Sequence, residues 1–480
     1  AEMQTGVPVF LGTFASPTGT RPASLVQTGV FGFGGATSLL VKTGDAAAET
    51  QGATFLNFRD PIGNGGTAFT GTLLRGSGVP KVTAADERGL WSNAFADPDG
   101  ALHLVARVGT AAPGGSDRYA SIQDIALNDG HHLFWTATLT GPVAKKNALF
   151  TQSSLQAPAE IVLRAGQTLA PRAVVRSFAA LHSGGTLGDN LPGGSAGFGS
   201  GRPNGGATTP VRVTFTDSTV AVVNAGSGVL DLIARTNEAP PDFHGLWKTL
   251  GLPSAGGSAI AFRATLKPLP GSKDVTTKNA GVLYAKSEDQ ALTRIARQGE
   301  LAPGFAPLTY GAFSDPILNA AGDILYFAQL AGPGVTVANR EVLYVALHDS
   351  GGSVIVQRTG EEAPELPGIL VAAFTGAALP RCADPNDPRG PVFTAKLQSG
   401  DVAVKTTNNS GLFAVDSTGA LRLLARTGEQ VNGKTLKTVD AFSYVLGSPV
   451  QARTAAASPE VIYRATFTDR SQALVKVPVP

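Results

Sequence analysis

The sequence predicts an all-β fold built from one unit that recurs along the chain. Seven strand-like apolar runs each end in a basic residue, then one further residue and, in six of the seven, glycine. The basic residues are Lys42, Arg107, Arg164, Arg235, Arg297, Arg358 and Arg426. They lie 65, 57, 71, 62, 61 and 68 positions apart, and a recurrence of that size indicates a repeat architecture.

Composition is the second observation behind this fold class. The chain has 480 residues, with 59 glycines, 32 prolines and 15% charged residues, and 42% of its residues are hydrophobic. That hydrophobic share is too high for a disordered chain. Abundant Gly, Pro, Thr, Ser and Val are typical of short strands and tight turns, so we expect less than about 10% helix.

The order of strands within one unit is the third observation, and it is clearest between Arg297 and Arg358. Residues 311–318 are expected to form a first strand, and 324–330, a continuous apolar run, a second. Residues 342–346 and 354–358 are expected to be the third and fourth strands. Tight turns join strand one to two and strand three to four, which predicts antiparallel hairpins.

The other units repeat this order of four strands. Their predicted second strands are Thr67–Leu74, His131–Leu139, Val211–Thr216, Ser258–Leu266, Pro391–Leu397 and Glu460–Phe467. A longer, often proline-bearing passage such as Ala302-Pro303-Gly304 follows strand four, and it suits a crossing to the next sheet. Trp91, Trp135 and Trp247 lie in or near strands and are expected to be core aromatics.

The two ends of the chain complete the count. The first 44 residues align with strands two, three and four of a unit, and the last forty or so with strands one, two and three. The total of about thirty strands in four-stranded meanders predicts a β-propeller of seven or eight blades, eight being slightly favoured. Residues 1–480 are expected to form a single domain, with long loop insertions near 184–209 and 375–390.

The units resemble the tandem Arg-x-Gly-x-x-Ala-Pro-Gly repeats of secreted bacterial proteins, and the resemblance covers nearly the whole chain. It implies a β-propeller and no catalytic residue. The motif changes at Asn237, where glycine is expected, and at Val431, where the Ala-Pro step is missing.

The seven basic residues are interpreted as structural anchors of the repeat. A guanidinium donates several hydrogen bonds, and backbone carbonyls are the partners expected in most units. An acid follows 17 or 18 positions later in only three units, at Asp60, Asp124 and Asp315. A ring of basic groups that binds an anionic ligand is the functional alternative.

No catalytic, cofactor-binding or metal-binding residue is predicted. His131 and His132 are adjacent in a strand and point to opposite faces, and the other histidines fall in different units. Asp384, Asn386 and Asp387 could hold Ca²⁺ in a loop, but a solvated turn is favoured over that weak possibility. The single cysteine, Cys382, excludes an intrachain disulfide.

These observations favour a non-enzymatic protein that binds a protein partner or assembles with itself as a scaffold. The alternative is an extracellular enzyme, a polysaccharide or polymer hydrolase or lyase with its site at the mouth of a central channel. A net charge of +2 with scattered basic residues gives no basis for nucleic-acid binding. We expect no transmembrane segment, because no run reaches 18 consecutive apolar residues. A start at Ala1 suits signal-peptide removal, so we expect an extracytoplasmic location (periplasmic, cell-surface or secreted).

Overall fold

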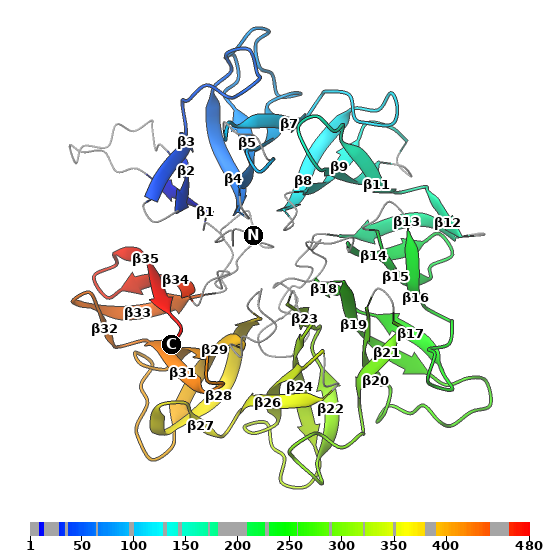
Figure 1. The fold of residues 1–480 in the computed structure, drawn as a ribbon, viewed down its shortest axis with the longest axis vertical. Coiled ribbons are helices and arrows are strands. Elements are labelled where there is room, and N and C mark those ends of the chain that lie inside the picture. The colour runs from blue at the N-terminus through cyan, green and yellow to red at the C-terminus, as the bar shows by residue number, and fades with distance from the viewer. Residues whose placement is uncertain are drawn as a thin grey trace. The chain divides into compact units, whose positions relative to one another are not determined.

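The described part of the chain is built from strands and turns (Figure 1). The computed structural model describes residues 9–13, 28–33, 37–63, 66–95, 100–127, 132–142, 146–170, 173–180, 209–225, 230–256, 258–287, 290–319, 322–348, 352–379, 390–441 and 460–480. These residues contain no helix, and therefore none long and apolar enough to cross a membrane. The predicted all-β class is confirmed.

The strands of the first four sheets follow one another along the chain. The first sheet has the order β1 (Val9–Thr13), β2 (Thr28–Phe33), β3 (Thr37–Lys42). The second is β4 (Phe55–Gly63), β5 (Thr67–Leu73), β6 (Arg88–Ser92), β7 (His103–Arg107). The third is β8 (Tyr119–Leu127), β9 (Leu133–Leu139), β10 (Asn147–Gln152), β11 (Glu160–Arg164). The fourth is β12 (Thr168–Ala170), β13 (Ala173–Ala179), β14 (Pro210–Phe215), β15 (Val220–Asn224), β16 (Asp231–Arg235).

The remaining four sheets keep the same sequential order. The fifth has β17 (Leu246–Leu250), β18 (Ser254–Gly256), β19 (Ala259–Lys267), β20 (Gly281–Lys286), β21 (Thr293–Arg297). The sixth has β22 (Thr309–Phe313), β23 (Ile317–Leu318), β24 (Ile324–Ala331), β25 (Glu341–Ala346), β26 (Ser353–Arg358). The seventh has β27 (Glu362–Ala363), β28 (Leu366–Ala378), β29 (Val392–Ser399), β30 (Ser410–Val415), β31 (Leu421–Arg426). The eighth has β32 (Gln430–Val431), β33 (Lys434–Asp440), β34 (Glu460–Phe467), β35 (Gln472–Pro478).

These antiparallel meanders are the blades of a β-propeller, so the predicted fold class is confirmed. The described residues form eight sheets, which matches the larger of the two predicted blade numbers. The described residues form 35 strands, of which five are short pieces of two or three residues (β12, β18, β23, β27 and β32), and the other thirty match the expected number of about thirty. The first sheet consists of strands two to four of a unit, and the eighth has strands one to three.

By its internal contacts the chain divides into two compact units. The first contains residues 1–181, 215–217 and 444–451, and the second contains 182–214, 218–443 and 452–480. That residues 1–480 form one domain stays a prediction.

Most residues of the two predicted insertions lie outside the described residues. The insertion near 184–209 lies outside the described residues except for Thr209. The one near 375–390 begins later than expected, because β28 continues through Ala378. Phe374 and Ala377 are buried and pair with β29, so the core keeps this segment in the sheet.

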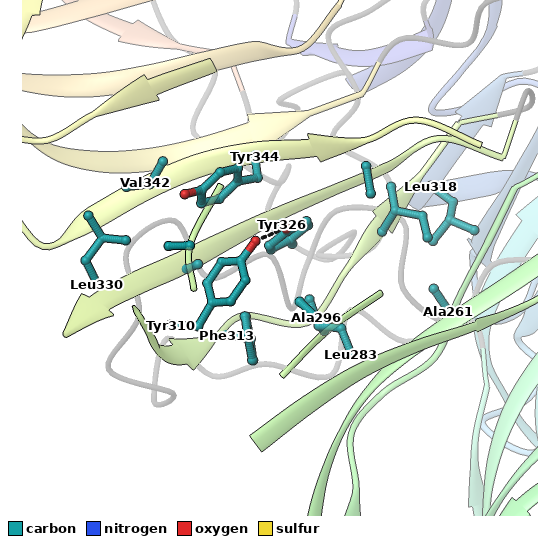
Figure 2. Close-up of a cluster of buried hydrophobic side chains, with 14 of the residues drawn as sticks. Ala261, Leu283, Ala296, Tyr310, Phe313, Leu318, Tyr326, Leu330, Val342 and Tyr344 are labelled. Carbon is teal, nitrogen blue, oxygen red and sulfur yellow. Dashed lines mark hydrogen bonds between the residues drawn. The ribbon is translucent and has the colours of Figure 1, made fainter. Parts of the chain in front are cut away.

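In five of the eight sheets the core is built on directly opposed aromatic side chains of strands two and three. Their rings are stacked within 20° of parallel, in the pairs Phe69–Trp91, Trp135–Phe150, Phe262–Tyr284, Tyr326–Tyr344 and Phe393–Phe413. A first-strand aromatic such as Tyr310 then meets the third-strand ring obliquely, at 5.7 Å and 68° from Tyr344 (Figure 2). The three tryptophans are 0–1% exposed, so their predicted place in the core is confirmed.

The polar ends of these core tyrosines have partners. The hydroxyls of Tyr310 and Tyr326 are 3.0 Å apart (Figure 2). Tyr326 also donates to Ser353 Oγ (2.9 Å). The Tyr344 hydroxyl donates to the carbonyl of Pro303 (3.1 Å). Each buried hydroxyl therefore keeps a hydrogen bond while its ring packs in the core.

Candidate functional site

The feature that recurs with constant geometry is the turn after each fourth strand, which we call the crossing turn. It consists of the basic residue, the next residue, the glycine (or Asn237) and the residue after that. The glycines have φ values between +81° and +90°, a region in which side chains other than glycine are strained. Asn237 takes the position at φ 73°, and asparagine tolerates this region better than most residues. The break in the motif therefore leaves the turn intact.

Each crossing turn is hydrogen-bonded to the first strand of the following sheet. The N–H at the glycine position donates to a carbonyl of that strand at 2.7–2.9 Å in all seven turns. The accepting residues are Phe55, Tyr119, Val175, Trp247, Tyr310, Val371 and Leu436. Each of them returns its own N–H to the residue after the glycine position. This two-way pair joins consecutive sheets, as the predicted crossing requires.

The basic side chain turns back toward its own sheet. In four turns the arginine Nε donates to a backbone carbonyl 18 to 21 positions earlier. These bonds are Arg107 to Asp86 (2.7 Å), Arg297 to Asn279 (2.9 Å), Arg358 to Asn339 (2.7 Å) and Arg426 to Asn408 (3.0 Å). Backbone carbonyls are the partner class expected from the sequence.

The other three basic residues have different partners. Lys42 Nζ donates to Asp45 (2.6 Å), Arg164 pairs with Asp117, and Arg235 Nε donates to Thr219 Oγ1 (2.9 Å). Two guanidiniums also lie over aromatic rings: Arg297 is 3.8 Å from the centroid of Phe243, and Arg358 is 4.9 Å from that of Phe305. The role of all seven as structural anchors stays a prediction.

A second repeated motif, missed in the sequence, supplies the carbonyl that the arginine binds. It lies in the loop between strands two and three and follows the pattern Val-Thr/Lys-x-x-Asn/Asp, at 82–86, 275–279, 335–339 and 404–408. The Asn or Asp oxygen accepts the N–H of the second residue at 2.7 Å in all four loops. A search of the residues 18 to 21 positions before these four arginines would have revealed it.

The glycine and the second motif are in contact. A Cβ placed on Gly360 would lie 3.0 Å from Asn339 Cβ, and one on Gly428 would lie 3.1 Å from Asn408 Cβ. Both the arginine and the glycine of one turn therefore rest on the same asparagine. This close approach, together with the positive φ, explains why glycine is needed there.

The acids that follow the crossing turn do not gather in the described part of the chain. Asp315 is 5% exposed and accepts from Arg263 Nε (3.1 Å), and Asp124 accepts from Thr136 Oγ1 (3.2 Å). The Asp60 side chain lies outside the described residues. Asp315 thus has a partner in the fifth sheet, Arg263 of β19.

The possible metal ligands of the described residues lie in different parts of the fold. The described residues hold no cluster of three or more His, Cys, Asp or Glu side chains able to bind a metal ion. His103 lies 2.8 Å from Glu49, and the His348 N–H donates to Asp323. His131, His182, Cys382 and the candidate Ca²⁺ loop with Asp384, Asn386 and Asp387 lie outside the described residues. The Ca²⁺ hypothesis stays a prediction.

One carboxyl has a pKa near neutrality. Burial raises the pKa of Glu341 to about 7, an effect only partly offset by the neighbouring Arg340 guanidinium. Glu341 begins β25 and lies opposite Gln329 of β24. Its carboxyl is therefore a titrating group in the sheet, and its protonation contributes to the stability of the protein.

Comparison with known proteins places the chain in a family. A family model described as "Family of unknown function (DUF7453)" matches residues 4–203 and 205–442. None of the curated proteins matches the chain.

Several solved structures are similar at low identity. Saccharomyces cerevisiae Sqt1 is 8% identical (95% of this chain, 90% of that one, TM-score 0.37). The periplasmic gluconolactonase PpgL of Pseudomonas aeruginosa is 15% identical (99% and 100%, TM-score 0.30). An acylaminoacyl peptidase is 11% identical (89% and 51%, TM-score 0.35). The chain spans about half the length of this peptidase and of a similar prolyl endopeptidase. Likenesses this weak say nothing about activity.

Proposed function

This chain belongs to DUF7453, a family of unknown function, and we propose that it is a non-enzymatic scaffold that binds another protein. The observation that carries the proposal is the use of the repeated polar groups. In the crossing turns they make hydrogen bonds within the chain that join sheets and brace loops. A frame braced in this way can present loops to a partner without changing itself.

Exposed apolar side chains in the loops at one end of the strands support a binding role. In a meander, strands two and four run in the same direction. The loop between strands two and three and the crossing turn after strand four therefore lie at the same end of the strands. In the second of the two compact units, this end of the sheets carries Leu301, Val337 and Val402, which are 64%, 76% and 47% exposed. Apolar side chains that protrude from loops favour association with a protein.

The proposed partner is another protein or a second copy of the chain. The proposed place of binding is outside the cytoplasm. The insertions near 184–209 and 375–390 stay candidate contact segments. Their test is deletion, which should leave folding nearly unchanged because the cost of loop closure grows slowly with length. Fractionation of the native cells tests the extracytoplasmic location.

The experiment is affinity capture of the tagged chain from its native source, with partners identified by mass spectrometry. We expect a stoichiometric partner whose capture is reduced by the combined change Leu301→Ser, Val337→Ser and Val402→Ser. The matched control is Leu347→Ser. Leu347 is 39% exposed, but it lies at the opposite end of the strands, in the turn between strands three and four. Turnover of a polymer that is abolished by one acid or histidine substitution would overturn the proposal in favour of an enzyme.

A further inference from the structure

The turn that follows the last crossing turn differs from its counterparts in one side chain. Six positions after the basic residue, three other units have proline where the last one has asparagine, at Pro113, Pro303, Pro364 and Asn432. The next residue has a positive φ in all four units: 79° at Gly114, 77° at Gly304, 58° at Glu365 and 76° at Gly433. The repeat therefore keeps a turn at this place, and the last unit puts an amide side chain there instead of a proline ring.

Asn432 and Gly433 form the two-residue loop of the hairpin that joins β32 to β33. Val431 and Lys434 pair across the hairpin directly beside the loop. The φ values of the two loop residues are 51° and 76°, and positive φ at both positions defines a type I′ turn, in which Asn-Gly is strongly preferred. Both loop residues are exposed, so water reaches the Asn432 amide and the backbone nitrogen beside it.

This hairpin can open while the rest of the sheet stays folded. β32 pairs with β33 at two positions, whereas β34 pairs with β35 at seven. Opening gives up those two pairs and the contact of half-buried Val431 with the core, and local opening of so small an element costs far less than global unfolding. The start of β33 stays anchored meanwhile, because Lys434 Nζ donates to Asp469 (2.8 Å) and to Ser471 Oγ (2.7 Å). The loop can therefore leave its turn geometry without unfolding of the protein.

We propose that Asn432 is a site of spontaneous succinimide formation, which converts it to aspartate or isoaspartate. Asparagine is a chemically labile residue, and Gly433 has no Cβ to shield its nitrogen from the neighbouring side chain. The backbone nitrogen of Gly433 loses its proton to water and attacks Cγ of Asn432. The N–Cγ bond forms, the Cγ–Nδ2 bond breaks, and the amide nitrogen takes up a proton and leaves as ammonia. Water then opens the ring, at Cγ to give aspartate or at the backbone carbonyl carbon to give isoaspartate.

The two products have different consequences for the hairpin. Aspartate tolerates the left-handed region as asparagine does, so it keeps the turn and adds one negative charge. Isoaspartate carries the chain through its side-chain carbon, which adds a methylene to the backbone of a loop that has only two residues. The pairing of Val431 with Lys434 is then lost, and β32 separates from β33. This chemistry needs no partner, so it is independent of the proposed binding role.

Asn237 is a matched control in the same chain. It is exposed and has φ 73°, so it shares the left-handed backbone of Asn432. It is followed by Glu238, whose side chain crowds the attacking nitrogen, and its Oδ1 accepts a hydrogen bond from Lys267 Nζ (2.6 Å). Asn237 should therefore stay intact under conditions that convert Asn432.

The test incubates the folded full chain in heavy-oxygen water, digests it with trypsin in ordinary water and analyses the peptides by mass spectrometry. We expect heavy oxygen in place of the amide nitrogen at position 432 of peptide Thr427–Lys434, and none at position 237 of peptide Thr236–Lys248. Backbone fragment ions distinguish isoaspartate from aspartate. Asn432→Gly should remain unlabelled and keep the turn, because Gly-Gly also suits type I′. Amide hydrogen exchange in residues 430–435 should become faster with incubation in the wild type and stay constant in Asn432→Gly.

Three results would overturn the inference. Label at position 432 in the urea-unfolded chain but none in the folded protein would show that the turn keeps the Asn432 amide away from the Gly433 nitrogen. Equal label at positions 237 and 432 would show that the glycine after the asparagine has no influence. Exchange that becomes faster in Asn432→Gly as well would show that the hairpin opens for another reason.

Discussion

At the scale of the residue, one arginine side chain links two loops that are far apart in the sequence. Arg358 donates to the Asn339 carbonyl, which lies 19 positions earlier, and its guanidinium also covers Phe305. Arg297 repeats both contacts with Asn279 and Phe243. Because the same geometry recurs in different sheets, the loss of either side chain should have the same consequence.

We therefore predict that Arg297→Ala and Arg358→Ala each lower the free energy of unfolding by about 1–3 kcal/mol, since a half-buried carbonyl loses its donor. Denaturant unfolding followed by fluorescence measures the loss, and Arg59→Ala, at an exposed arginine, is the control. If both variants kept full stability but failed to bind an anionic partner, the basic residues would instead form a binding ring.

The titration of Glu341 gives a second prediction at this scale. Its folded-state pKa of about 7 lies above the usual value of 4.5, so the folded protein retains a proton that the unfolded chain has lost. The stability from this group is complete below pH 4.5 and is lost as the pH rises through 7. We expect a loss on the order of 1–3 kcal/mol across that range.

Unfolding of the wild type and of Glu341→Gln at a series of pH values measures this contribution. The difference in unfolding free energy between the two proteins should change between pH 4.5 and 7 and stay constant below pH 4. A difference that is flat over the whole range would show that Glu341 has an ordinary pKa.

At the scale of the element, the crossing turn combines a conformational and a steric demand for glycine. Gly360 has φ +81° and a crowded Cβ position, whereas Gly419 has φ +80° and open space around it. The two glycines therefore separate the two demands.

We predict that Gly419→Ala costs about 1–2 kcal/mol, the strain of the left-handed region alone. Gly360→Ala should cost about 1 kcal/mol more, because Asn339 must also move. Thermal unfolding of both variants under one set of conditions gives the comparison. Equal losses would mean that the loop carrying Asn339 yields without cost.

At the scale of the whole molecule, the eighth sheet differs from the sixth in the burial of its third strand. Exposed and half-buried residues alternate along β35, whereas five of the six residues of β25 are buried. Opening of a sheet is easiest where few apolar contacts and covered hydrogen bonds must be broken.

We predict that native-state amide exchange is faster in β35 than in β25 under conditions that leave the protein folded. Mass spectrometry after timed deuteration measures both strands in one experiment. Equal protection would show that another segment covers β35 in solution.

Most of the fold follows from local patterns in the sequence. The Gly311–Arg358 unit shows this well: its four expected strands correspond to β22–β23, β24, β25 and β26. Period-two alternation, apolar runs and turn residues act between neighbours in the chain, so they are legible without the structure. The short strands β12, β18, β27 and β32 were not predicted, because two or three residues carry no periodicity. The late start of the second insertion was also missed, because the burial of Phe374 and Ala377 depends on β29.

The sequence by itself determined the repeat, the all-β class, the order of four strands in each unit and the partial first and last sheets. It also indicated that the arginines would meet carbonyls. Only the tertiary structure decided which carbonyls these are and that the glycine rests on the same asparagine. Those contacts join loops 18 or more residues apart, and their geometry depends on how whole sheets pack, which no local pattern encodes.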